Sequence, residues 1–246
     1  MLHGKKIVVT GGGRHFGRAL SIWFAREGAD VSLCSRNVQQ AVATANKIQN
    51  EGGIARAYQC DIADIVSVRQ FAALVVADQK PIDILVLSAA QWLDGALASG
   101  ESDEEIFSTI NSGLTGSVLL TKALLPHMNR VQGSDIVAIN SSCGVPNFTE
   151  SVAHPAFFAA KQGLGAFCHK ISKTLSADNI RVTSLYPPDF ETLDIDEDIS
   201  LHDRTGQSLL TGQSVWQTLK FVVTQPRSCH ISAIHFQGPT REDLIA

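Results

Sequence analysis

A run of three glycines followed by two basic residues is the first feature of this sequence with evident chemical potential. Residues 10–17 read TGGGRHFG and follow directly on the β-branched run that begins at residue 7. In a strand–turn–helix of this kind, backbone N–H groups and the helix dipole can receive a pyrophosphate. Glycine is needed where the chain turns tightly and where a side chain would exclude the phosphates. The pattern predicts a dinucleotide site, although a tight turn that binds nothing can look the same.

Two arginines indicate which dinucleotide this site would take. Arg36 follows the second predicted strand, where an NAD site would carry an acidic residue for the ribose 2′-hydroxyl. An arginine there suits a 2′-phosphate, and Arg14 in the glycine turn adds a second cation to a charge-assisted clamp. NADP(H) is therefore favoured over NAD(H). The alternative is that both arginines are ordinary surface charges.

Apolar strands that alternate with helices would position these residues. The strands are predicted at residues 7–10, 31–34, 55–60, 82–87, 136–139 and 181–186 and around 231–236, and the helices at residues 16–27, 38–51 and 64–78 and around 103–130, 156–177 and 208–224. Because each strand is nearly all apolar, helices should cover both faces of a parallel sheet. The alternation predicts an α/β fold, a Rossmann-type doubly wound parallel sheet of about seven strands in three α/β/α layers, as one domain over residues 1–246.

Composition and charge narrow the classes of partner. Of the 246 residues, 44% are hydrophobic and 18% are charged, and the net charge is −4. The scattered basic residues offer no electrostatic footprint for nucleic acid, so small molecules are the expected partners. Five cysteines stand far apart with no CxxC pair, which indicates free thiols in a reducing compartment, by default the cytoplasm. No signal peptide, membrane helix or metal site is predicted.

The stretch at 189–207 has no recognisable specificity pattern and includes the acidic letters DIDED at 194–198. It is predicted to be a mobile loop. A loop after a late strand of an open α/β sheet lies beside the ligand crevice, so both a lid and a plain solvated connection remain open.

The letters at 10–17 resemble the glycine signature TGxxxGxG of the short-chain dehydrogenase/reductase family. Thr10, Gly11, Phe16 and Gly17 match it, whereas His15 occupies the position of the middle glycine, where some pteridine-reductase-like members tolerate a basic residue. The resemblance extends over roughly residues 5–238. It implies an NADP(H)-dependent protein acting on a small carbonyl or alcohol substrate, and a homodimer or homotetramer formed through the helices at about 103–130 and 156–177.

The resemblance also implies a set of cofactor contacts. Ala89 is the one residue of LSAA at 87–90 that matches the family's NNAG turn, and Asp61 matches the aspartate that contacts the adenine, although it could equally cap the next helix. The predicted cofactor-binding residues are Thr10, Gly11, Arg14, His15, Phe16, Gly17, Arg36, Asp61, Ile62, Ala89, Lys161, Pro187 and Thr192.

The catalytic positions of the family are only partly retained. By resemblance, Ser141 holds the substrate carbonyl oxygen, Asn111 anchors a water in a proton relay, and Lys161 holds the nicotinamide ribose. The family motif YxxxK is FFAAK here, so Phe157 stands where the catalytic tyrosine would be and has no proton to give. Without the resemblance, Ser141 is a polar turn residue and Asn111 an ordinary helix asparagine.

Two functions therefore remain open. In the first, the protein is a carbonyl reductase whose proton comes from water or from His154, which lies three residues before Phe157 and could also be only an exposed residue at a helix start. In the second, it is a non-catalytic NADP(H)-binding regulator or the silent subunit of an oligomer.

Overall fold

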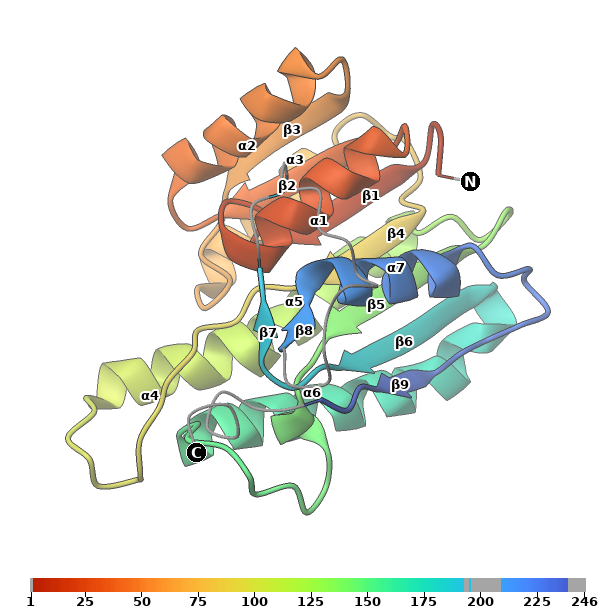
Figure 1. Cartoon of the computed structure of the whole chain (residues 1–246). Coiled ribbons are helices and arrows are strands. Elements are labelled where there is room, and N and C mark those ends of the chain that lie inside the picture. Colours follow the sequence, from red (N-terminus) through yellow and green to blue (C-terminus); the bar gives the residue numbers. More distant parts are fainter. Residues whose placement is uncertain (1, 193–194, 196–208, 239–246) are drawn as a thin grey trace.

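A computed structural model of the chain describes residues 2–192, 195 and 209–238. Its centre is a seven-stranded sheet with the order β3-β2-β1-β4-β5-β6-β9, parallel at every pairing (Figure 1). These strands are β1 (Lys6–Thr10), β2 (Asp30–Ser35), β3 (Ile54–Gln59), β4 (Ile84–Leu87), β5 (Ser134–Ile139), β6 (Ile180–Tyr186) and β9 (Ala233–His235). The predicted doubly wound parallel sheet is confirmed.

Helices cover both faces of the sheet, because successive strand residues point to opposite sides. The helices are α1 (His15–Arg26), α2 (Val38–Asn50), α3 (Ile65–Val76), α4 (Asp103–Ile110), α5 (Gly116–Leu124), α6 (Pro155–Leu175) and α7 (Gly212–Val223). One buried cluster joins the sheet to α1, α2 and α7, and a second joins its other face to α3, α5 and α6 (Figure 1). In the part of the chain that is described, no helix is both long enough and apolar enough to span a membrane.

Two features differ from the sequence-based expectation. The single helix expected over 103–130 is divided, because a π-helical turn at Asn111–Thr115 separates α4 from α5. Gly116, where α5 begins, passes so close to the carbonyl oxygen of Ile62 that a Cβ would collide with it. A two-stranded sheet of β7 (Phe190–Glu191) and β8 (Leu210–Thr211) was not expected, since strands of two residues leave no periodic signal.

The carboxyl ends of β1 and β4 are held together at close range. The hydroxyl of Thr10 accepts hydrogen bonds from the N–H groups of Ser88 at 2.9 Å and Ala89 at 3.0 Å. Gly11 has a φ of +72°, and a Cβ on it would lie 3.1 Å from the Cα of Ala89. A Cβ on Gly17 in α1 would collide with the carbonyl oxygen of Gly11. The turn at 10–17 is thus a backbone junction that admits no larger residues at these points.

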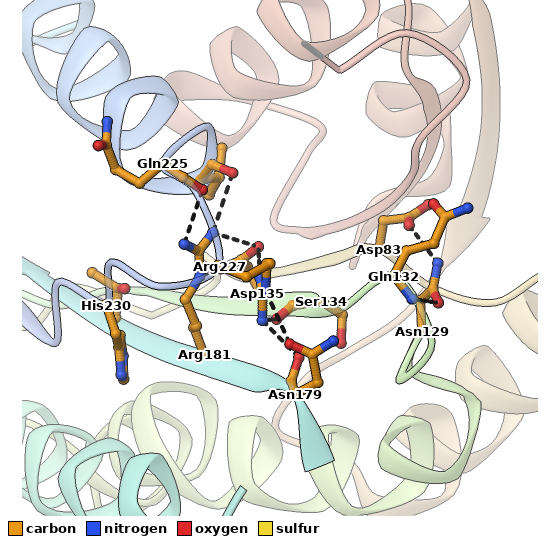
Figure 2. Close-up of polar contacts among 12 residues, drawn as sticks. Asp83, Asn129, Gln132, Ser134, Asp135, Asn179, Arg181, Gln225, Arg227 and His230 are labelled. Atoms are coloured by element: carbon orange, nitrogen blue, oxygen red, sulfur yellow. Dashed lines mark hydrogen bonds and ion pairs between the residues drawn. The ribbon is translucent and has the colours of Figure 1, made fainter. Parts of the chain in front are cut away.

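A buried ionic network ties the opposite, amino edge of the sheet together (Figure 2). Arg181 on β6 donates to both carboxylate oxygens of Asp135 on β5, at 2.7 and 3.2 Å, and Arg227 donates to the same carboxylate at 3.1 Å. The same two guanidinium groups also donate to backbone carbonyls. Arg181 donates to those of Val223, Gln225, Pro226 and Cys229, and Arg227 donates to those of Ser134 and Asn179. Asp135 and Arg181 are each only 6% exposed. The network joins β5, β6 and the segment after α7.

Replacing Asp135 with asparagine should therefore destabilise the fold strongly. The amide keeps the shape of the carboxylate but leaves a buried arginine without its counter-charge, which costs about 3 kcal/mol of unfolding free energy or more. Urea-induced unfolding, followed by circular dichroism, measures this difference.

Asp178→Asn is the matched control for that measurement. Asp178 pairs with Arg130 at 3.5 Å, and their side chains are 40% and 49% exposed, so its loss should cost less than about 1 kcal/mol. Equal effects of the two substitutions would contradict a structural role for the buried network.

Candidate functional site

A cavity of about 790 Å³ lies at the carboxyl ends of β1 to β5. This volume is in the range of small-molecule and cofactor sites, and the position is where ligands bind open α/β sheets. Ten predicted site residues line it, namely Gly11, Arg14, His15, Phe16, Gly17, Arg36, Asp61, Ile62, Ala89 and Lys161. Residues far apart in the sequence are thus brought together at one edge of the sheet.

The N-terminus of α1 faces this cavity without a side-chain cap. Arg14 is the capping residue and makes no side-chain hydrogen bond to the first turn, which leaves backbone N–H groups there without a protein partner. By contrast, side chains cap the starts of α2, α3, α4, α6 and α7. The open N-terminus is suited to an anionic group, because the helix dipole adds to the free N–H groups.

The two predicted clamp arginines are also without partners. Arg14 and Arg36 are both exposed and both line the cavity. Among residues 2–192, 195 and 209–238, neither guanidinium makes a hydrogen bond or an ion pair, whereas Arg181 and Arg227 at the other edge make several each. Two unneutralised cations beside an uncapped helix start can bind a phosphate.

His15 occupies a strained backbone position. Its φ is +46°, in the left-handed region that favours glycine, and it stands where the glycine signature has its middle glycine. A residue with a Cβ in this region costs roughly 1–2 kcal/mol. The histidine therefore keeps the turn geometry of a glycine, at a cost in stability, and places an imidazole on the cavity wall.

Lys161 is the one lysine among the cavity-lining residues. It is 5% exposed, and its Nζ donates to the carbonyl oxygen of Ile139 at the end of β5, at 3.0 Å. Burial lowers the pKa of Lys161 to about 8 because the charged form is poorly solvated there. The ammonium also lies 5.5 Å from the ring centroid of Phe157, within the range of a cation–π contact.

Phe157 belongs to a small apolar cluster next to the cavity. It is 6% exposed and packs with Cys143 and Ala153, and Phe148 and Phe158 are packed against this cluster. Trp92, which does line the cavity, meets the Phe157 ring edge-to-face with centroids 4.8 Å apart. The side chain at position 157 is therefore in apolar surroundings and is covered by an indole ring.

Seven predicted residues do not line the cavity. They are Thr10, Asn111, Ser141, His154, Phe157, Pro187 and Thr192. Thr10 supports the turn, and the carbonyl of Pro187 accepts from the N–H of Ser142 at 2.8 Å. The carbonyl of Asn111 accepts from Gly116 in the π-helical turn, and Thr192 is exposed. Their predicted roles in binding or catalysis stay predictions.

His154 is a buried helix cap in this fold. It is fully buried, and its Nδ1 accepts a hydrogen bond from the N–H of Ala156 at 3.1 Å, which leaves the proton on Nε2. That Nε2 lies 4.0 Å from Glu101 and makes no hydrogen bond within the described residues. The imidazole is therefore not an exposed residue, and it does not line the cavity.

Sequence reasoning missed other residues that line the cavity. They are Cys34, Ser35, Asn37, Gln40, Cys60, Ser88, Ala90, Gln91, Trp92, Ser108, Ser112, Ile139, Asn140 and Phe190. Many directly follow strands, so their position after a predicted strand could have indicated them. Ser108, Ser112 and Phe190 had no such signal, because only the tertiary fold brings the end of α4 and the start of β7 to this edge.

The predicted loop at 189–207 lies mostly outside the described residues. Its first part forms β7, where Phe190 lines the cavity and packs edge-to-face against Phe16, with centroids 5.0 Å apart. A lid role for the rest stays a prediction. Among the residues that the structure does describe, no group of three or more histidine, cysteine or acidic side chains could hold a metal ion.

Comparison with known proteins gives consistent matches. A family model described as short chain dehydrogenase matches residues 5–201. The 3-dehydrosphinganine reductase TSC10B of Arabidopsis thaliana is 27% identical over 196 residues, 79% of this chain but only 58% of that protein. The 3-oxoacyl-(acyl-carrier-protein) reductase of Homo sapiens is 31% identical over 196 residues, 79% of each chain. A short chain dehydrogenase structure from Burkholderia cenocepacia J2315 in complex with NADP has a TM-score of 0.81 at 26% identity, covering 96% of this chain and 98% of that one.

The strain at His15 can be measured with two substitutions. His15→Gly and His15→Ala both remove the imidazole, but only alanine keeps a Cβ at positive φ. We expect the glycine variant to be more stable than the alanine variant by about 1 kcal/mol, which is roughly 2–4 °C in Tm. Differential scanning calorimetry measures the two transitions. An alanine variant as stable as the glycine variant would show that this backbone is unstrained.

Proposed function

The chain belongs to the short chain dehydrogenase family, and we propose that it binds NADP(H) in the cavity and reduces a small carbonyl compound. The observation that carries the proposal is that Arg14 and Arg36, which pair with no other described residue, stand beside the uncapped start of α1. The related Burkholderia structure, which is a complex with NADP, supports the same cofactor.

The residues at the cavity fit the phosphates of NADP(H). The free N–H groups at the start of α1 would receive the pyrophosphate, and the two arginines would hold the 2′-phosphate on the adenosine ribose. A Cβ on Gly13 would lie 2.7 Å from the side chain of Ser35, so the glycine lets the turn pack closely against the end of β2. Asp61 and Ile62 would lie at the adenine.

Bound NADPH supplies a hydride, so the protein has to orient the carbonyl and deliver a proton. The Oγ of Ser141 accepts from the N–H of Cys143 at 3.2 Å, and its own proton has no acceptor among the described residues. Ser141 follows Asn140, which does line the cavity, and its O–H would donate to a carbonyl oxygen at that end and stabilise the charge that develops during hydride transfer.

Lys161 is the group best placed to supply the proton. It uses one N–H on the Ile139 carbonyl and keeps two others for ligands. Its lowered pKa, about 8, makes the ammonium a stronger acid than an ordinary lysine while leaving it mostly protonated at neutral pH. His154 is less suitable, since it is buried behind the helix start that it caps.

A second candidate is a non-catalytic NADP(H)-binding regulator or silent subunit. The apolar surroundings of Phe157, closed by Trp92, favour it because they leave no hydroxyl at the family's proton-donor position. Assembly into a homodimer or homotetramer and a cytoplasmic location also stay predictions.

Cofactor preference tests the first part of the proposal. Arg36→Ser should weaken NADPH binding about tenfold or more, because a charged hydrogen bond to the 2′-phosphate is lost, and should change NADH binding by less than about twofold. Isothermal titration calorimetry with both cofactors measures this. Arg69→Ser, at an exposed position on α3 outside the cavity, is the control and should change neither affinity. Equal weakening of NADPH and NADH by Arg36→Ser would contradict the 2′-phosphate contact.

Steady-state rates test whether the protein reduces carbonyl compounds and whether Lys161 supplies the proton. NADPH oxidation should be measured with a panel of ketones, aldehydes and pterins from pH 6 to pH 10. We expect slow reduction that declines as the pH rises through about 8, because Lys161 then loses the proton that it delivers. Phe157→Tyr should raise the rate by a factor of about 10² or more, because it adds the phenol used in general acid catalysis.

Phe158→Tyr is the control for that variant. Its ring stacks on Phe148 at a centroid distance of 6.4 Å, whereas it is the Phe157 ring that lies beside Lys161 and Trp92, so Phe158→Tyr should leave the rate unchanged. If the natural protein binds NADPH but turns over nothing, while Phe157→Tyr is active, the non-catalytic function is correct.

A further inference from the structure

We propose that Cys34 and Cys60 form a redox-active thiol pair, a modification site that peroxide converts to a disulfide inside the cavity. Cys34 lies near the end of β2, and Cys60 directly follows β3. Both side chains line the cavity, in the wall that also carries Arg36 and Asp61. The two residues are only 1% and 3% exposed, so a peroxide molecule would have to reach them through the cavity.

The sheet brings the two cysteines together although they are distant in the sequence. β2 and β3 pair in parallel with Cys34 opposite Tyr58, and Cys60 stands two residues beyond Tyr58, on the same face. The N–H of Cys60 donates to the carbonyl of Ser35 at 3.0 Å, which holds the two strand ends side by side. Both side chains belong to one buried cluster, and each is the leading cause of the shift in the other's pKa. Diagonal neighbours of a ladder lie roughly 7–8 Å apart, so a disulfide requires the strand ends to move closer together.

Their different surroundings make the two thiols chemically unequal. The neighbouring Cys34 and then Ser67 lower the pKa of Cys60, because they favour its thiolate. The neighbouring Cys60, together with burial, raises the pKa of Cys34. Since the thiolate is the nucleophile, Cys60 is the thiol that reacts first and Cys34 is the resolving thiol.

The oxidation is balanced with hydrogen peroxide as the oxidant. The Cys60 sulfur attacks one peroxide oxygen, the O–O bond breaks, and a sulfenic acid forms as one water leaves. The Cys34 sulfur then attacks the Cys60 sulfur, the S–O bond breaks, and a second water leaves. Two thiols have lost two electrons and two protons, and one peroxide has become two waters.

The effect on the cofactor rests on the proposed function. A disulfide would draw the end of β3 toward the end of β2, and with them the segments that carry Asp61 and Arg36 into the cavity. The space in which the adenosine end of NADP(H) would bind then becomes narrower. Bound NADPH should in turn cover both thiols and protect them from peroxide.

The other cysteines provide internal comparisons. Burial raises the pKa of Cys168 to about 11, and no other cysteine is among the groups that shift its pKa, so it has no resolving partner. Cys229 is partly exposed and lies at the amino edge, where its carbonyl accepts from Arg181 at 2.8 Å. It is therefore the control for a thiol that is accessible but has no partner in the cavity.

Peptide mass spectrometry without reduction tests the thiol pair directly on the natural protein. After hydrogen peroxide treatment we expect a cross-linked peptide that joins Cys34 to Cys60, reversed by dithiothreitol and retained in Cys229→Ser. In Cys34→Ser, dimedone should trap a sulfenic acid on Cys60, whereas in Cys60→Ser the Cys34 thiol should stay reduced. Saturating NADPH should slow formation of the disulfide by about tenfold or more, as expected when the ligand covers the thiols.

The outcomes separate this inference from the proposed function. The thiol pair is overturned if Cys60 stays reduced under conditions that oxidise Cys229, or if the disulfide joins other residues. The cofactor effect is overturned if the oxidised protein binds NADPH as tightly as the reduced one rather than about tenfold or more weakly. If the reduced protein does not bind NADPH at all, the proposed function fails, and the peptide map still decides whether the thiol pair exists.

Discussion

The close approach of backbone to backbone at the carboxyl edge of the sheet is the constraint on which the cavity depends. Gly17 in α1 lies against the carbonyl of Gly11, and Gly11 lies against Ala89 at the end of β4. The Thr10 hydroxyl closes the junction with hydrogen bonds to Ser88 and Ala89. Because a Cβ on Gly17 would collide and one on Gly11 would be crowded, α1 begins almost on the sheet, and its first N–H groups, which no described side chain caps, form part of the cavity wall.

The two edges of the sheet use arginine in opposite ways. At the amino edge, Arg181 and Arg227 converge on Asp135 and on a ring of carbonyl groups, so their charges are neutralised within the fold (Figure 2). At the carboxyl edge, Arg14 and Arg36 stand in the cavity wall with no partner in the described part of the chain. A cation that is already paired contributes to stability, whereas an unpaired one at a cavity can be matched by a ligand. This difference in pairing, rather than the presence of arginine, distinguishes the binding edge.

The part of the cavity around Lys161 and Phe157, where hydride and proton transfer would occur, offers fewer charged groups than the part around Arg14 and Arg36, where the phosphates of NADP(H) would bind. Lys161 keeps its place at the end of β5, and burial lowers its pKa. Phe157 fills the neighbouring position with an apolar ring, and Trp92 packs over it. The shape of the cavity depends on backbone packing, whereas the proposed proton transfer would depend on single side chains, so one can be kept while the other changes.

The order of strands and helices and the glycine turn could be predicted from the sequence, because periodic burial and glycine requirements are local properties. The unpaired state of Arg14 and Arg36 could not, since it depends on which acidic residues the fold brings near. The division of the 103–130 helix, the burial of His154 and the contact of Trp92 with Phe157 likewise follow from packing between distant segments. The cysteines read as isolated thiols in the sequence, and only the parallel pairing of β2 with β3 places Cys34 beside Cys60. A linear sequence carries residue types and their local spacing, whereas neighbours across a sheet are decided by strand order and register.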